Sequence, residues 1–255
     1  MRFFRIIRQA LLSDNKIKKY VTYAFGEIIL VVIGILIALA INNINQEHNI
    51  RKKEKVYLEG LQKELETSKN KLQELIKINH ANYEGAKRIV YFIENPDSLI
   101  SEEQFSELIF NSLAFDIAFN PNNSLLNEMI NSGSLKDISN NQLRVYLTNW
   151  ISTLDDVAKQ EVDLEKQREK VINILSGEEY SIKTIFDFNQ GIKSQIDLPT
   201  SKITRSNLKI LASPEFENNL IMFILSAFAT EQNHYIPLQD ELDRMIELIT
   251  VELSK

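Results

Sequence analysis

The residue types that most often carry chemistry are few and scattered in this chain of 255 residues. None of the three histidines, His48, His80 and His234, has the H-x-x-x-H or H-E-x-x-H spacing that places two imidazoles on one metal ion, although helix packing could still bring His80 and His234 together. The absence of cysteine excludes disulfides, thiolate metal sites and thiol nucleophiles. Phosphate-binding glycine loops and the G-x-S-x-G serine motif are also missing. We therefore expect no catalytic residue, no cofactor and no metal, and a protein that is not an enzyme.

One charged residue, Glu27, requires an interpretation. It is the only charge between residues 20 and 41, a segment rich in isoleucine, leucine and valine. An acid inside a membrane is costly and often marks a helix contact or a proton path. Three interpretations stay open: Glu27 lies near the inner interface, contacts another helix, or couples proton movement within an ion-driven membrane complex.

Residues 20–41 have the length and composition of a transmembrane helix. At 1.5 Å per residue they extend roughly 33 Å, enough to cross a hydrocarbon core of about 30 Å. A cleaved signal peptide is one alternative, because Ala38-Leu39-Ala40 resembles a cleavage site, and a buried helix of a soluble protein is the other. The long basic region before the span and the charge of Glu27 argue against cleavage, so we expect a retained anchor. Gly34 and Ala38 form a small-xxx-small pair that permits close helix packing, and we expect a homo-oligomer or a membrane-protein partner.

The first nineteen residues are basic and the rest of the chain is acidic. The basic side chains of this head are Arg2, Arg5, Arg8, Lys16, Lys18 and Lys19. Positive flanks stay in the cytoplasm, so residues 42 onward are expected on the outer side. Residues 2–12 also have the pattern of a helix lying in the membrane interface, where the arginines either only set topology or bind anionic lipid or a partner. The net charge of −6 argues against a nucleic-acid partner.

After the span, apolar residues recur at helical spacing in three long segments. Such seams are buried most simply in an up-down bundle. Some seam residues, Asn79, Glu161 and Arg168 among them, are polar and either lie exposed at the bundle ends or pair across helices. The seams are Leu58, Leu61, Leu65, Ser68, Leu72, Leu75, Asn79, Asn82, Ala86, Ile89 and Ile93; Leu143, Leu147, Trp150, Leu154, Val157, Glu161, Leu164, Arg168, Val171 and Leu175; and Ile221, Ile224, Phe228, Glu231, Tyr235, Leu238, Leu242, Met245, Ile249 and Glu252.

Start and stop signals divide the chain further. Ser101-Glu-Glu-Gln104 is a capping box and predicts a helix over 102–117. A short helix ends at Gly133, residues 178–205 form a long excursion with a short strand or helix around 182–188, and Ser213-Pro214 begins the last helix. Pro237 should kink or split that helix. The uncharged run 218–230 within it is too short to span a membrane and is expected to be bundle core.

These patterns predict an all-α fold. An N-terminal transmembrane helix continues without a break into an elongated antiparallel helical bundle. The predicted divisions are a cytoplasmic basic segment over 1–19, the transmembrane helix over 20–41 and the bundle over 42–255.

Two motifs near the N-terminus carry a resemblance. The block R-F-F-R-I-I-R-Q-A-L-L-S and the phrase Y-A-F-G-E-I-I-L-V-V-I-G-I-L-I-A-L-A-I-N-N resemble the DUF6090 type of single-pass membrane proteins from flavobacteria and other Bacteroidetes. Weaker similarity continues at Ser124–Gly133 and Ser213–Asn218. The resemblance implies a Gram-negative inner membrane with the bundle in the periplasm, and it supplies no activity.

The expected function is a non-enzymatic interaction or scaffold module on the lipid bilayer that self-associates. One alternative is a sensory or regulatory accessory subunit that signals through a partner, with an unknown small-molecule ligand. The other is a subunit of an ion-driven complex that uses Glu27.

Overall fold

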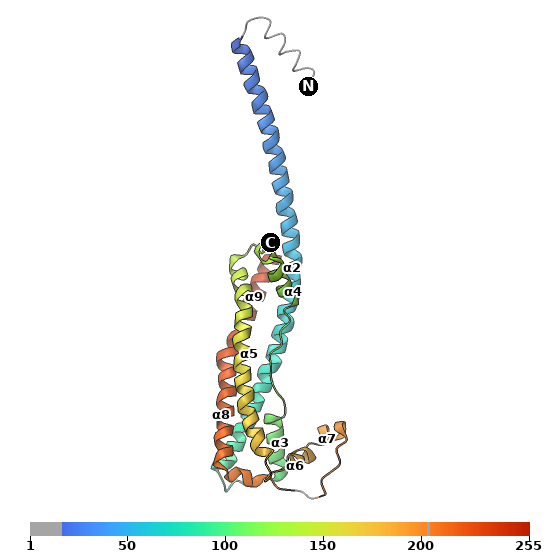
Figure 1. Ribbon diagram of the computed structural model, residues 1–255, viewed down its shortest axis with the longest axis vertical. Coiled ribbons are helices and arrows are strands. Elements are labelled where there is room, and N and C mark those ends of the chain that lie inside the picture. The colour runs from blue at the N-terminus through green and yellow to red at the C-terminus, as the bar shows by residue number, and fades with distance from the viewer. Residues whose placement is uncertain (1–16, 203–204) are drawn as a thin grey trace. The chain divides into compact units, whose positions relative to one another are not determined.

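The computed structural model describes residues 17–202 and 205–255, which are helical or irregular and contain no strand. The chain divides into two compact units, Met1–Val56 and Tyr57–Lys255. Helix α2, Ile17–Glu94, contributes to both units, which confirms a helix without a break after the apolar segment (Figure 1).

In the first unit, the apolar side chains of α2 are uncovered. From Val21 to Ile41 every large apolar side chain is exposed, with Leu30 at 69%. By length and composition this is one helix that could cross a membrane, and a signal sequence passes the same test. An apolar surface of this extent is not stable in water, so it requires lipid, another protein or removal.

The second unit is a bundle of four segments that alternate in direction, three of them long helical segments and one a broken helix. After α2 come α5, Asn141–Leu175, and the last segment, which joins α8, Pro214–Thr230, to α9, Ile236–Leu253. Hydrogen bonds and ion pairs set the register: Gln62 bonds to Thr250, Lys69 to Asp243, Asn79 to Ala227, and Asn140 to Glu252. The α8–α9 segment therefore runs antiparallel to both α2 and α5.

The remaining segment of the bundle is a broken helix that returns between α2 and α5. It consists of α3, Glu102–Leu113, an extended stretch over 114–123, and α4, Ser124–Ser132, followed by the short helix η1, Ser134–Asp137 (Figure 1). The capping box at Ser101 and the left-handed Gly133 after α4 are confirmed. The predicted helix over 102–117 ends early, at Leu113. Asp116 accepts a hydrogen bond from the Ile117 amide instead, and the residue before Pro121 is driven away from helical geometry.

Polar side chains of α2 and α5 hold the backbone of this stretch, most of whose residues are exposed or half-buried. A non-helical backbone must find partners for its amides and carbonyls, and side chains of α2 and α5 supply them. The seam residues therefore pair across segments, which was one of the two alternatives. The contacts are Arg168 to Leu113 O (2.7 Å), Phe119 N to Glu161 (2.8 Å), Lys71 to Asn120 O (3.0 Å), Asn122 N to Ser68 (2.9 Å) and Leu125 N to Glu64 (2.8 Å).

The predicted seams of α2 and α5 are buried almost throughout. Ile93, Leu154 and Arg168 are half-buried, and the other seam residues of these helices are buried. The side chain of Asn140 caps α5, because it accepts a hydrogen bond from the Leu143 amide.

The predicted seam of the last segment is right in α9 and wrong in α8. Phe228 is 50% exposed and Ile221 and Ile224 are half-buried, whereas the buried residues of α8 are Phe216, Leu220, Phe223, Ala227 and Thr230. The reason is a π-helical turn, η3, over Glu231–Tyr235. Its wider winding shifts the buried face, so an α-helical period carried back from α9 selects the wrong residues of α8. Pro237 thus splits the helix, as expected, through this turn.

The excursion after α5 is helical rather than a strand. It contains α6, Ile182–Phe188, α7, Gln190–Ile196, and the short helix η2, Leu208–Ala212. Asp187 ties it together by ion pairs with Lys183 (3.2 Å) and Lys193 (3.3 Å). Ser213 then caps α8, as predicted.

Candidate functional site

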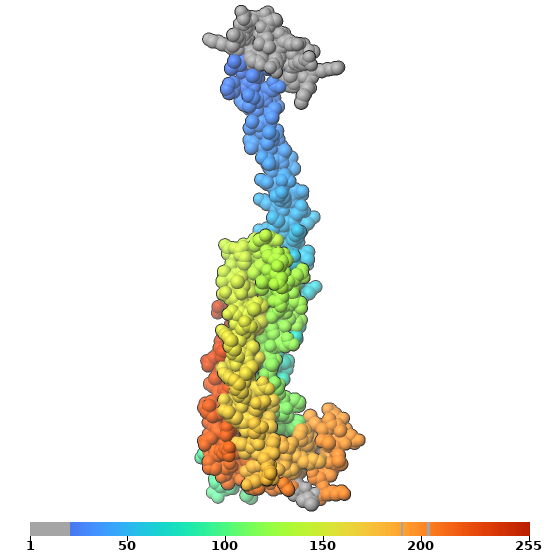
Figure 2. All heavy atoms as spheres, in the orientation of Figure 1, coloured from blue at the N-terminus to red at the C-terminus, as the bar shows by residue number. Residues whose placement is uncertain are grey.

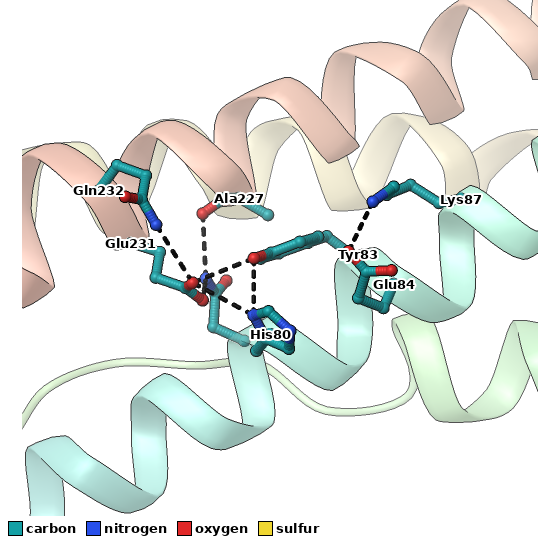
Figure 3. Close-up of polar contacts among 8 residues, drawn as sticks. His80, Tyr83, Glu84, Lys87, Ala227, Glu231 and Gln232 are labelled. Atoms are coloured by element: carbon teal, nitrogen blue, oxygen red, sulfur yellow. Dashed lines mark hydrogen bonds and ion pairs between the residues drawn. The ribbon is translucent and has the colours of Figure 1, made fainter.

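The most concentrated group of buried polar side chains surrounds Glu231, the first residue of η3. Its carboxylate is 6% exposed and faces one turn of α2 that carries Asn79, His80 and Tyr83 (Figure 3). We call these four residues the Glu231 cluster.

Four side chains contact the Glu231 carboxylate. The Tyr83 hydroxyl donates to Oε1 over 3.0 Å, and the amides of Asn79 and Gln232 donate over 3.3 and 3.4 Å. The His80 Nδ1 atom lies 3.2 Å from Oε1 and 2.7 Å from the Tyr83 hydroxyl oxygen. The tautomer of His80 decides the hydrogen-bond partner of its Nδ1 atom. An Nδ1 that carries hydrogen donates to Glu231, and an Nδ1 without hydrogen accepts from Tyr83.

Helical spacing brings together the three members of this cluster that lie on α2. Residues 79, 80 and 83 lie within one turn of α2, so their side chains point to a common side. Asn79 also donates to the Ala227 carbonyl over 3.0 Å, about one turn before η3 begins. Pro237 lacks an amide hydrogen, and the wider turn before it accommodates this loss. The cluster therefore stabilises an irregular helix.

The electrostatics of the cluster favour a neutral tyrosine. Burial, and then the hydrogen bond and negative charge of Glu231, raise the pKa of Tyr83 to about 12. Tyr83 thus remains a donor over the physiological range. The nearby Lys87 is paired with Glu84 over 2.6 Å.

A second buried carboxylate, Glu161, contacts the other end of η3. It accepts from the Tyr235 hydroxyl and from the Phe119 amide, both over 2.8 Å. Burial raises the pKa of Glu161, against the effect of these two hydrogen bonds, and Asp116 adds to the rise. Burial and the charge of Glu161 likewise raise the pKa of Tyr235.

Chemically, both groups make hydrogen bonds that hold backbone atoms in place. Within residues 17–202 and 205–255, no set of three or more histidine, aspartate and glutamate side chains could hold a metal ion. His80 is 57% exposed while its partner carboxylate is buried, so the imidazole lies between that carboxylate and solvent.

A surface groove of about 600 Å³ lies between α5 and α9. Tyr146, Asn149, Pro237, Glu241 and Arg244 line it. Burial raises the pKa of Glu241 in this groove. A neighbouring hollow shares Asn149, Pro237 and Glu241 and adds His234. The structure thus places His234 against α5 and His80 against η3, and does not bring the two histidines together.

The site residues expected from the sequence lie in the first unit. Glu27, Gly34 and Ala38 are exposed on α2, and Lys18 and Lys19 belong to its first turn. No atom lies within 4 Å of a β-carbon placed on Gly34, beyond its own helix. Arg2, Arg5, Arg8 and Lys16 lie outside the described residues.

The sequence pattern placed Asn79, Glu231 and Tyr235 on seams, but it did not predict that residues of the Glu231 cluster contact one another. Tyr83 was not singled out at all. The partners lie 148 to 152 positions apart, so no local spacing links them. The only local signal was Pro237, which marks an irregular turn just after Glu231.

The fold and these sites describe a helical bundle joined to one long apolar helix. The chain belongs to the DUF6090 family, a family of unknown function, whose model matches residues 27–156. The match begins at Glu27, within the apolar motif, and includes Asn79, His80 and Tyr83 but not Glu231. Comparisons with curated proteins and with solved structures give no significant match.

Proposed function

We propose that the protein is a single-pass membrane protein that acts as a non-enzymatic interaction or scaffold module and self-associates. Its basic head would lie in the cytoplasm, and its bundle in the periplasm of a Gram-negative cell. The supporting observation is the uncovered apolar surface of α2 between Val21 and Ile41, beside a basic head. Lipid covers such a surface at the least energetic cost.

The polar groups in the bundle interior support a structural role for the bundle. Glu64, Ser68, Glu161 and Arg168 hydrogen-bond to the backbone of the broken helix or of α4. They are engaged in holding the fold, which suits a scaffold better than an enzyme.

Single-cysteine labelling tests the topology, because the chain has no native cysteine. Glu169→Cys on the exposed face of α5 should react with a membrane-impermeant maleimide in intact spheroplasts. Ser13→Cys in the head should react only after lysis. A protein released into periplasmic extract, with a mature start near Ile41, would contradict the anchor.

Amine-reactive crosslinking in native membranes tests the scaffold role. Dimers or larger species of the 29.5 kDa chain, or adducts with a partner, are the expected result. Recovery of monomer alone would contradict this role.

The groove between α5 and α9 favours a second candidate, a sensory or regulatory subunit that binds a ligand. Glu241, whose pKa burial raises, and Arg244 offer both signs of charge to a small polar molecule. A metabolite screen by thermal shift tests it: a ligand that stabilises the wild type but not Glu241→Ala would support this candidate.

A further inference from the structure

Helix α8 carries two apolar seams, and only one of them faces the bundle. The inner seam is Phe216, Leu220, Phe223 and Ala227, all buried. The outer seam is Asn218, Ile221, Leu225, Phe228 and Gln232, at the 3,4,3,4 spacing of a coiled coil.

The outer seam is only partly covered in the single chain: Ile221 is half-buried, and the Phe228 ring packs edge-on against Tyr83 of α2 with ring centroids 6.1 Å apart. Leu225 is 56% exposed and Phe228 is 50% exposed, and the adjacent Met222 is 50% exposed. α8 lies beside α5 at the surface of the bundle unit (Figure 2). A helix that is apolar on both sides is normally buried on both sides.

The structure assigns this outer seam to a second copy of the same chain: we infer that two bundles pair through α8 across a two-fold axis. This inference rests on the proposed self-association and names its surface.

Charge supports a second copy as the occupant. Residues 218–230 carry no charge, in a protein with a net charge of −6. A foreign partner is normally recognised partly by complementary charge, whereas an identical uncharged seam is complementary to itself. Asn218 and Gln232 give the seam polar ends that can fix the register.

The area involved explains why the pairing needs the membrane anchor. Three half-exposed side chains of about 200 Å² offer roughly 300 Å² per copy, or about 600 Å² for two. Stable interfaces bury about 1,200 Å² or more in total. The seam alone therefore gives a weak dimer, and attachment of both copies to one membrane raises their effective concentration.

Cysteine crosslinking in native membranes tests the inference. A two-fold interface brings its central residue next to its own copy, so Leu225→Cys should form a disulfide-linked dimer under mild oxidation. The matched control is Val162→Cys on α5, which is 49% exposed and lies outside the outer seam, and it should stay monomeric. Leu225→Glu in the full-length protein should reduce amine-crosslinked dimer several-fold, because two carboxylates would face each other. Its unchanged circular dichroism would show that the bundle still folds.

Each other outcome overturns a different claim. If wild type gives amine-crosslinked dimers while Leu225→Cys stays monomeric, self-association uses another surface and this inference fails alone. If Leu225→Cys crosslinks to a different protein, the occupant is not a second copy. If every variant is monomeric, the proposed self-association fails as well.

Discussion

Glu161 joins two segments that no local pattern would bring together, and its titration should be measurable. A raised pKa means that the folded state binds more protons than the unfolded chain above the ordinary value of 4.5. The contribution of Glu161 to the free energy of unfolding therefore falls as pH rises through that value.

Glu161→Gln should remove this pH-dependent loss of stability, because an amide does not titrate. Its side-chain oxygen can still accept hydrogen bonds from the Phe119 amide and the Tyr235 hydroxyl. We expect the variant to gain stability relative to wild type between pH 4 and pH 7, as measured by chemical denaturation in detergent. Glu169→Gln on the exposed face of the same helix should show no such gain. Glu161→Ala should instead lose about 1–3 kcal/mol, because it leaves buried donors without a partner. If Glu161→Gln became less stable relative to wild type as pH rises, the assignment of a raised pKa to Glu161 would be wrong.

Glu27 distinguishes the scaffold proposal from the ion-driven alternative. If the protein is a scaffold, Glu27→Gln should leave membrane insertion and dimer yield unchanged, since an uncharged amide is no harder to hold in lipid. Cell fractionation and crosslinking measure both. A variant that assembles normally but loses the cellular phenotype of the wild type would support ion coupling instead.

At the scale of elements, close packing of α2 against α3 depends on Gly85. A β-carbon at this position would lie 2.4 Å from the Ser112 hydroxyl oxygen but 3.7 Å from the Ser112 β-carbon. Ser112 is buried, so its hydroxyl has little room to move.

Gly85→Ala should therefore destabilise the bundle despite the higher helix propensity of alanine. In a Ser112→Ala background the clash is gone, and the same change should stabilise by about 0.5–1 kcal/mol. Thermal unfolding of the four proteins in this cycle measures the reversal. Equal effects in both backgrounds would show that the hydroxyl is not the obstacle.

Sequence patterns predicted the elements well where the helix stayed regular. The seams of α2 and α5 follow from periodicity, and the caps at Ser101 and Ser213 follow from local hydrogen bonding. The buried face of α8 was predicted wrongly, because the π-helical turn η3 shifts the helical period. The side-chain contacts around this turn join residues far apart in the sequence, so local periodicity does not reveal it. The extended stretch over 114–123 was missed for a similar reason: its partners lie on α2 and α5.

The Glu231 cluster shows the limit of sequence reasoning for sites. The seam pattern placed Asn79 and Glu231 on inner faces, which is where they lie. Their pairing depends on the antiparallel register of α2 against α8 and α9, and that register is a property of the folded bundle.

At the scale of the whole molecule, the two units differ in what stabilises them. The buried apolar residues belong to the second unit, from Leu58 to Ile249. We expect a fragment of residues 57–255 to fold by itself into a helical protein that remains in solution and is mostly monomeric at micromolar concentration. Circular dichroism and sedimentation velocity measure this. Aggregation or a loss of helix would show that the bundle needs the first 56 residues.

The π-helical turn also has an evolutionary consequence. Its extra winding is tolerated because Asn79 and Glu231 are matched across the bundle, and the family match includes only the first of these. A relative whose last segment is one residue shorter would regain an ordinary helix there. In such a relative, the residues that correspond to Asn79 and Glu231 could both be apolar. A length change near position 232 should therefore accompany paired substitutions at these two positions, which lie on different helical segments.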